Sequence, residues 1–172
     1  MKAAEEKRMP REHKGSLNGT GRSFAIVASR YSKVITEQLV GGAIECLTQH
    51  GCSAEAIEVF WVPGSFELPL VARRVAQSGR FDAVLALGCV IRGQTTHHEY
   101  IAKEVAQGLS RIAWETGRPA VFGVITAETM EQAIERAGIK TAGRGWEAAL
   151  TALEMADLLS QLDASAGGGQ RV

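Results

Sequence analysis

A glycine-containing turn followed by a histidine, at residues 88–97, is the part of the sequence best suited to chemistry on a phosphorylated substrate. Gly88 and Gly93 have the spacing of a nucleotide-binding Walker A loop, but Gln94 stands where that loop requires lysine. An NTPase is therefore disfavoured. A turn that opens a helix still offers backbone N–H groups and a positive dipole end to one phosphate. An ordinary connection between a strand and a helix explains the same residues, and both interpretations stay open on this segment alone.

His97 follows this turn at the expected start of a helix. An imidazole has an unperturbed pKa of about 6.5, so it can accept and donate protons at neutral pH. His98 is adjacent but is expected to point about 100° away around the helix, so the two should not act as a pair. Neither belongs to an H-E-x-x-H pattern, and no metal site is predicted. The alternative is a surface or helix-capping histidine.

The residues that follow Pro63 and Gly64 suit a ligand that carries hydroxyl groups. The Pro-Gly pair predicts a sharp turn, after which Ser65 is placed to cap a helix. Glu67 either compensates the dipole of that helix or accepts hydrogen bonds from a polyol, with Phe66 as a flat apolar wall. Both interpretations stay open.

Tyr31 and Arg136 are candidates in two other parts of the chain. Tyr31 comes directly after the first expected strand, where it could stack on a planar heterocycle or simply cover the core. Arg136 lies in the last turn of a short expected helix, just before Gly138. Its guanidinium can bind phosphate through two parallel hydrogen bonds, although a cation in that turn also favours the helix dipole without any other function.

Short apolar runs alternate with helical patterns between a polar arm at residues 1–22 and a loose, glycine-containing tail at 163–172. Four runs predict strands buried on both faces, at 24–28, 57–62, 83–87 and 120–125. Helices are expected at 33–50, 67–78, 98–116, 129–137 and 146–162. Gly51, Gly79, Gly117 and Gly138 follow four of them as left-handed caps, and Thr129 with Gln132 has the spacing of a capping box.

This order predicts an α/β domain over residues 23–162, a three-layer sandwich with a four-stranded parallel sheet between helices. Ligands of such folds bind beyond the carboxyl ends of the strands. The loops expected there span residues 29–32, 63–67, 88–97 and 126–128.

The composition argues against several classes of partner. Nineteen basic and nineteen acidic residues balance, which disfavours nucleic acid and acidic membranes as ligands. No apolar run is long enough to span a bilayer, and the charged N-terminal residues do not form a signal peptide. Cys46, Cys52 and Cys89 are odd in number and form no C-x-x-C motif, which predicts reduced thiols in a cytoplasmic protein.

Taken together, several motifs resemble the lumazine synthase family of riboflavin biosynthesis. The matching segments are residues 62–69 (VPGSFELP), 87–97 (LGCVIRGQTTH), 131–138 (EQAIERAG) and 147–155 (EAALTALEM). The resemblance covers about residues 23–162 and implies a flavodoxin-like fold. It also implies a transferase that condenses 5-amino-6-(D-ribitylamino)uracil with 3,4-dihydroxy-2-butanone 4-phosphate. The products would be 6,7-dimethyl-8-ribityllumazine, phosphate and water, with no cofactor or metal.

The resemblance also assigns roles to individual residues. It makes His97 the proton shuttle and places Arg136 at the leaving phosphate. The residues that it implies for the pyrimidine and ribityl groups are Tyr31, Ser65, Phe66, Glu67, Val90, Ile91, Phe122 and Lys140. Those that it implies for phosphate are Gln94, Thr95 and Arg136. His98 stands where the family usually has Phe or Tyr, and Arg144 lies in a segment that differs from the family's usual Gly-Asn-Lys-Gly.

The resemblance implies a homo-oligomer whose site lies between neighbours in a ring of five, with Phe122 and Arg136 supplied by the next subunit. A shell of 60 subunits is favoured over isolated pentamers or decamers, and riboflavin synthase is a further expected partner. The arm could extend a neighbour's sheet by strand addition. The alternatives are an archaeal-type riboflavin synthase, a non-catalytic shell protein that binds flavin or lumazine, and a flavodoxin-like receiver or electron carrier. The last is disfavoured because residues 29–32 lack an acidic cluster.

Overall fold

The chain alternates strands and helices and ends with an extra helix. The computed structural model describes residues 9–138 and 142–167. The strands in this part of the chain are β1 (Phe24–Ser29), β2 (Ile57–Val62), β3 (Ala83–Ile91) and β4 (Ala120–Ala127). The helices are α1 (Lys33–Gln49), α2 (Leu68–Gln77), α3 (His97–Thr116), α4 (Met130–Ala137) and α5 (Arg144–Gly167), with short 3-10 turns at Ala54–Ala56 and Ser65–Glu67. The predicted order of strands and helices is confirmed.

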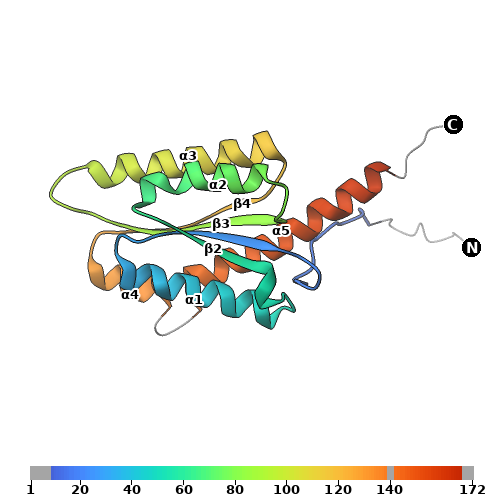
Figure 1. The fold of residues 1–172 in the computed structure, drawn as a ribbon, viewed down its shortest axis with the longest axis horizontal. Coiled ribbons are helices and arrows are strands. Elements are labelled where there is room, and N and C mark those ends of the chain that lie inside the picture. The colour runs from blue at the N-terminus through green and yellow to red at the C-terminus, as the bar shows by residue number, and fades with distance from the viewer. Residues whose placement is uncertain (1–8, 139–141, 168–172) are drawn as a thin grey trace, which may run out of the picture.

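The strands form one parallel sheet in the order β2-β1-β3-β4. Helices α2 and α3 cover one face, and α1, α4 and α5 cover the other (Figure 1). This strand order agrees with the flavodoxin-like order, in which β1 lies between β2 and β3. The predicted three-layer α/β sandwich is therefore confirmed.

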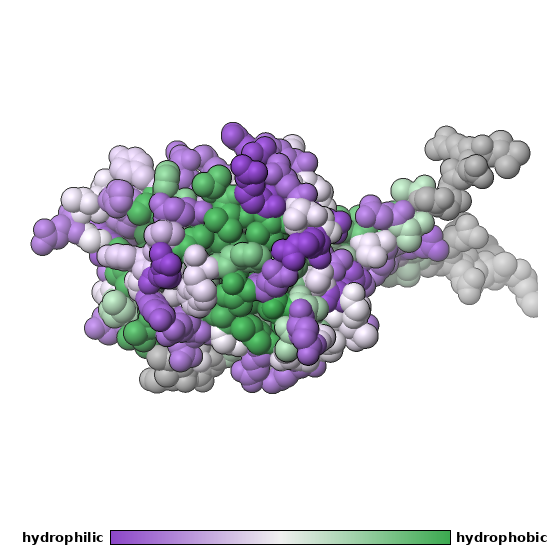
Figure 2. All heavy atoms as spheres, in the orientation of Figure 1, coloured by the Kyte–Doolittle hydropathy of each residue, from purple (hydrophilic) through white to green (hydrophobic). Residues whose placement is uncertain are grey.

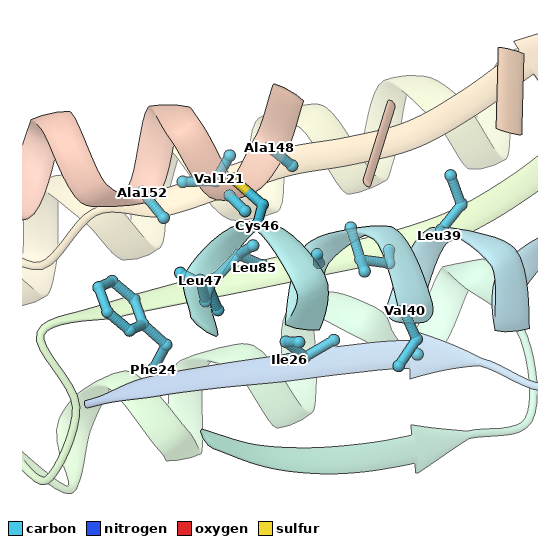
Figure 3. Packing of buried hydrophobic residues seen from close by; sticks show 14 of the residues in the cluster. Phe24, Ile26, Leu39, Val40, Cys46, Leu47, Leu85, Val121, Ala148 and Ala152 are labelled. Carbon is cyan, nitrogen blue, oxygen red and sulfur yellow. The ribbon is translucent and has the colours of Figure 1, made fainter. Parts of the chain in front are cut away.

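Two hydrophobic layers lie between the sheet and its helices. Every residue of β1 is buried, because alternate side chains enter opposite layers and both layers are covered by helices. Figure 3 shows the layer under α1 and α5, where Phe24 and Ile26 of β1 lie beside Leu47 of α1. This double burial holds the strands in a fixed register, so their carboxyl ends form a rigid edge.

The predicted helix boundaries depend on local caps, and the structure confirms these caps. Gly51, Gly79, Gly117 and Gly138 all have positive φ angles. At the start of α4, the backbone N–H of Gln132 donates to the Thr129 hydroxyl over 3.3 Å. In a capping box, the Gln132 side chain would accept from the N–H of the cap residue Thr129. Here its amide oxygen accepts instead from the N–H of Glu128, one residue earlier.

Some elements are longer than predicted. Strand β3 continues to Ile91 and β4 to Ala127, because pairing between the two strands extends from Gly88 and Val124 to Ile91 and Ala127. The predicted loop at 88–97 therefore begins inside the sheet. Helix α5 likewise continues to Gly167 rather than ending at residue 162.

The residues that precede β1 pack along α5 and are held by Asp157. Its carboxylate accepts the backbone N–H of Ser16 over 2.7 Å and the Arg22 guanidinium over 2.7 Å. Gln161 donates to the same carboxylate over 2.8 Å. The Ser16 N–H and these side-chain bonds lower the pKa of Asp157 to about 2.

The β2 edge of the sheet is incompletely covered. The side chains of Val59 and Phe60 are only partly buried, and Trp61 is 37% exposed. Figure 2 shows hydrophobic side chains gathered in the middle of this face, between the two helical layers. An exposed apolar edge strand is a surface on which another chain can pack.

Candidate active site

A cavity of about 440 Å³ lies where three of the four strands end, at the edge of the sheet that the fold class predicts for ligand binding. It is bounded by the connection between β1 and α1, the turn after β2, the end of β3 and the first turns of α3. The lining residues are Tyr31, Gly64, Ser65, Phe66, Glu67, Cys89, Val90, Ile91, Gly93, Thr95, His97, His98 and Ile101.

Two aromatic side chains stand at the mouth of the cavity. Tyr31 is 73% exposed and Phe66 is 60% exposed, so both rings have free faces. The backbone places them together, since the N–H of Arg30 donates to Val62 over 2.7 Å and that of Tyr31 donates to Pro63 over 3.1 Å. Large apolar rings left in solvent beside a cavity are suited to stacking on a planar ligand.

Ser65 lies on the inner wall of the cavity. Its side chain is buried, and its Oγ has no hydrogen-bond partner among the described residues. The prediction that Ser65 caps a helix is wrong, because α2 begins only at Leu68 and Ser65 opens the short Ser65–Glu67 turn instead. A buried hydroxyl without a partner is unfavourable, which suggests that a ligand supplies the missing bond.

Glu67 is half-buried on the same turn and also lines the cavity. Its backbone N–H donates to Gly64 over 3.4 Å, which closes the turn. The carboxylate is not used to cap α2. It can therefore accept hydrogen bonds from ligand hydroxyls.

His97 and His98 open α3, and both line the cavity. The helical spacing predicts that they point in different directions, and their different exposure agrees with this. The His97 side chain is exposed, whereas that of His98 is 15% exposed. The Nδ1 of His98 lies 3.2 Å from the carbonyl oxygen of Thr95, which ties the preceding loop to the helix.

An ion pair joins this loop to the one that follows β4. Arg92 donates to Glu128 over 2.8 Å, and this bond lowers the pKa of the Glu128 carboxyl and raises that of Arg92. Thr95 lines the cavity, but Gln94, its predicted partner in phosphate binding, does not. The Gln94 side chain is exposed.

Phe122 and Arg136 lie in different places from His97. Phe122 is 40% exposed on β4, where it lines a separate cavity of about 340 Å³ with Met155. Arg136 lines a third cavity of about 360 Å³, and its guanidinium donates to the carbonyl of Thr126. One chain thus does not bring these two residues to the cavity that holds His97. Lys140 lies outside the described residues.

Several lining residues were not singled out from the sequence. Cys89 is one of them, and it lies in the part of β3 that extends beyond the predicted strand. Ile101 is another, and the sequence could have indicated it because it lies one helical turn after His97. Burial raises the pKa of the Cys89 thiol to about 11, so it stays protonated and is not a nucleophile at neutral pH.

Among residues 9–138 and 142–167, no three His, Cys, Asp or Glu side chains come close enough to hold a metal ion. No helix in the same part of the chain has the length and apolar character needed to cross a bilayer.

A sequence model of the family described as 6,7-dimethyl-8-ribityllumazine synthase matches residues 21–160, which is most of the chain.

Proposed function

Because the chain belongs to the 6,7-dimethyl-8-ribityllumazine synthase family, we propose that it catalyses the reaction for which that family is named. In this reaction the aromatic amine of 5-amino-6-(D-ribitylamino)uracil condenses with 3,4-dihydroxy-2-butanone 4-phosphate. The carbon skeleton of the ketone becomes part of a second ring, and phosphate and water leave.

One observation carries the proposal. Eight of the residues that the family resemblance implies for substrate or proton transfer line a single cavity at the carboxyl ends of parallel strands. They are Tyr31, Ser65, Phe66, Glu67, Val90, Ile91, Thr95 and His97. They come from three separate segments of the sequence, so their convergence depends on the fold.

The cavity wall suits the two parts of the pyrimidine substrate. The exposed ring of Tyr31 can stack on the heterocycle, and Val90 and Ile91 at the end of β3 give it an apolar floor. The hydroxyl of Ser65 and the carboxylate of Glu67 can bind the ribityl chain, with Phe66 beside it. The unpartnered Ser65 Oγ supports this assignment, since a sugar hydroxyl would satisfy it.

His97 is the residue that we propose for the proton transfers, and its place in the lining of the cavity supports this role. Attack of the amine on the ketone gives a carbinolamine, which loses water to form an imine. The neutral imidazole can take the amine proton and return it to the leaving hydroxyl. Loss of the C3 proton then expels phosphate from C4 and leaves an enol, which tautomerises to a second carbonyl. Attack of the ribityl-bearing nitrogen on this carbonyl closes the ring with loss of another water. Alignment of two bound reactants supplies a large part of the acceleration.

A second copy of the chain would complete the site. Arg136 is the residue implied for the departing phosphate, yet it lies in a cavity separate from that of His97. Each edge strand of the sheet carries exposed apolar side chains, with Trp61 on β2 and Phe122, beside Met155, on β4. We infer a ring in which the Phe122 and Arg136 of one copy face the His97 cavity of the next. A pentamer is the expected ring, and a 60-subunit shell its expected assembly.

The test is to mix the purified chain with both substrates and measure lumazine absorbance and phosphate release. His97→Ala should slow turnover but leave pyrimidine binding mostly intact. Arg136→Ala should mainly raise the KM for the phosphorylated ketone. Arg74→Ala, an exposed residue in the last turn of α2, is the matched control.

Two results would replace this function with an alternative. Formation of riboflavin from lumazine alone would indicate a riboflavin synthase of the archaeal type. Tight binding of lumazine or flavin without any phosphate release would indicate a binding or shell protein.

A further inference from the structure

Three small residues lie close together beside the cavity, and each belongs to a different strand or to the turn that follows it. Ser29 is the last residue of β1, Ser65 opens the turn that follows β2, and Gly88 lies within β3. The alternation of side chains puts Ser29 and Gly88 on the face covered by α2 and α3, as continuations of Val27 and Ala86. This is also the face on which Ser65 packs.

Gly88 leaves space that the neighbouring turn occupies. A Cβ at this position would lie 2.7 Å from the Oγ of Ser65 and 3.3 Å from the Oγ of Ser29. It would also lie 3.2 Å from the Cδ1 of Leu68. The first of these separations is shorter than real Cβ contacts, so a side chain at position 88 would displace the Ser65 hydroxyl, and it would also crowd Leu68. The requirement is one of space, since Gly88 does not have a positive φ.

Ser65 depends on this close approach. Its side chain is 6% exposed, and its Oγ is left without a hydrogen bond among the described residues. Packing alone would be satisfied by alanine, and a buried unpaired hydroxyl is unfavourable. The hydroxyl is therefore held in place for something that enters the cavity it lines.

We propose that Gly88 is a positioning residue, whose missing side chain lets the Ser65–Glu67 turn lie against β3 so that Ser65 and Glu67 reach the polyol chain of the pyrimidine substrate. The proposal rests on the proposed function. The proposal extends that function to Gly88, which is not among the residues that line the cavity and would act through Ser65. Displacing the turn by several tenths of an ångström moves both the hydroxyl and the carboxylate, and such small misplacements are costly in an aligned site.

The test uses Gly88→Ala, Ser65→Ala and the double variant, with the KM of each substrate and kcat measured separately. Gly88→Ala should raise the KM for the ribityl pyrimidine about tenfold, with a much smaller change in the KM for the phosphorylated ketone. Ser65→Ala should raise the pyrimidine KM less, because only one bond is lost. The double variant should return to the value of Ser65→Ala, since removal of Oγ frees the space that the new methyl group needs.

A matched control separates positioning from general loss of packing. Gly19→Ala adds a methyl group 2.9 Å from the Cβ of Cys52, a similar overlap before β1 at the far end of the strands. It should lower Tm without changing the pyrimidine KM. Gly88→Ala with an unchanged pyrimidine KM would overturn the positioning role, as would a double variant no better than Gly88→Ala. A wild-type protein that does not convert the pyrimidine at all would overturn the proposed function as well.

Discussion

A mixture of two defective variants should regain activity if the active site is shared between copies of the chain. The structure places His97 and Arg136 in separate cavities of one chain. His97→Ala and Arg136→Ala are each expected to lose most of their activity, for different reasons. When they are unfolded together and refolded in equal amounts, some neighbouring pairs will combine the intact His97 of one copy with the intact Arg136 of the next.

The size of the recovery follows from this arrangement. In a closed ring each site takes His97 from one chain and Arg136 from its neighbour in a fixed direction. With random assembly, each of the two chains supplies the intact residue with a probability of about one half, so about a quarter of the sites are complete. The mixture should therefore reach about a quarter of the wild-type rate. Lumazine absorbance is measured at saturating pyrimidine and at a concentration of the phosphorylated ketone well below its wild-type KM, where the raised KM of Arg136→Ala leaves that variant with little activity.

The control for this experiment is a pair of variants within one cavity. His97 and Glu67 line the same cavity of the same chain, so every chain in a mixture of His97→Ala and Glu67→Gln lacks one of them. That mixture should show no recovery above the average of its components. Recovery in the control, or its absence in the first mixture despite normal oligomer size, would refute the shared site.

Three further outcomes are expected from local chemistry. Asp157→Asn should lower the free energy of unfolding by about 1–2 kcal/mol at neutral pH. Because the pKa of Asp157 is lowered to about 2, the difference from wild type in urea unfolding should persist above about pH 4 and vanish as the pH falls towards 2. Thr129→Ala removes the bond to the Gln132 N–H and should cost about 1 kcal/mol in the same assay. Iodoacetamide should label Cys89 of the native protein far more slowly than that of the urea-unfolded chain at pH 8, followed by mass spectrometry, because burial raises the pKa of this thiol to about 11.

Features that depend on neighbouring residues in the sequence were predictable. The left-handed caps at Gly117 and Gly138 follow from glycine's freedom to adopt positive φ, and the Thr129 cap follows from its spacing to Gln132. The apolar runs indicated buried parallel strands because residues covered on both faces leave no room for polar alternation.

Features that depend on pairing across the sheet were predicted less well. Gly88 was assigned to a loop because glycine is common in turns, yet pairing with Val124 keeps it in β3. Ser65 was expected to cap α2, but it is buried at the start of a separate short turn, and α2 begins only at Leu68. His98 was expected only to point in a different direction from His97, and the structure adds that both residues line the same cavity.

Residue types and spacing were enough to predict the alternating α/β architecture, the loops beyond the carboxyl ends of the strands and the resemblance to one enzyme family. Each of these depends on residue type and spacing along the chain. Only the tertiary structure decided that Tyr31, Ser65 and His97 meet in one cavity while Phe122 and Arg136 lie elsewhere. The physical reason is that the distance between two loops is set by strand order and register, which arise from contacts between residues far apart in the sequence.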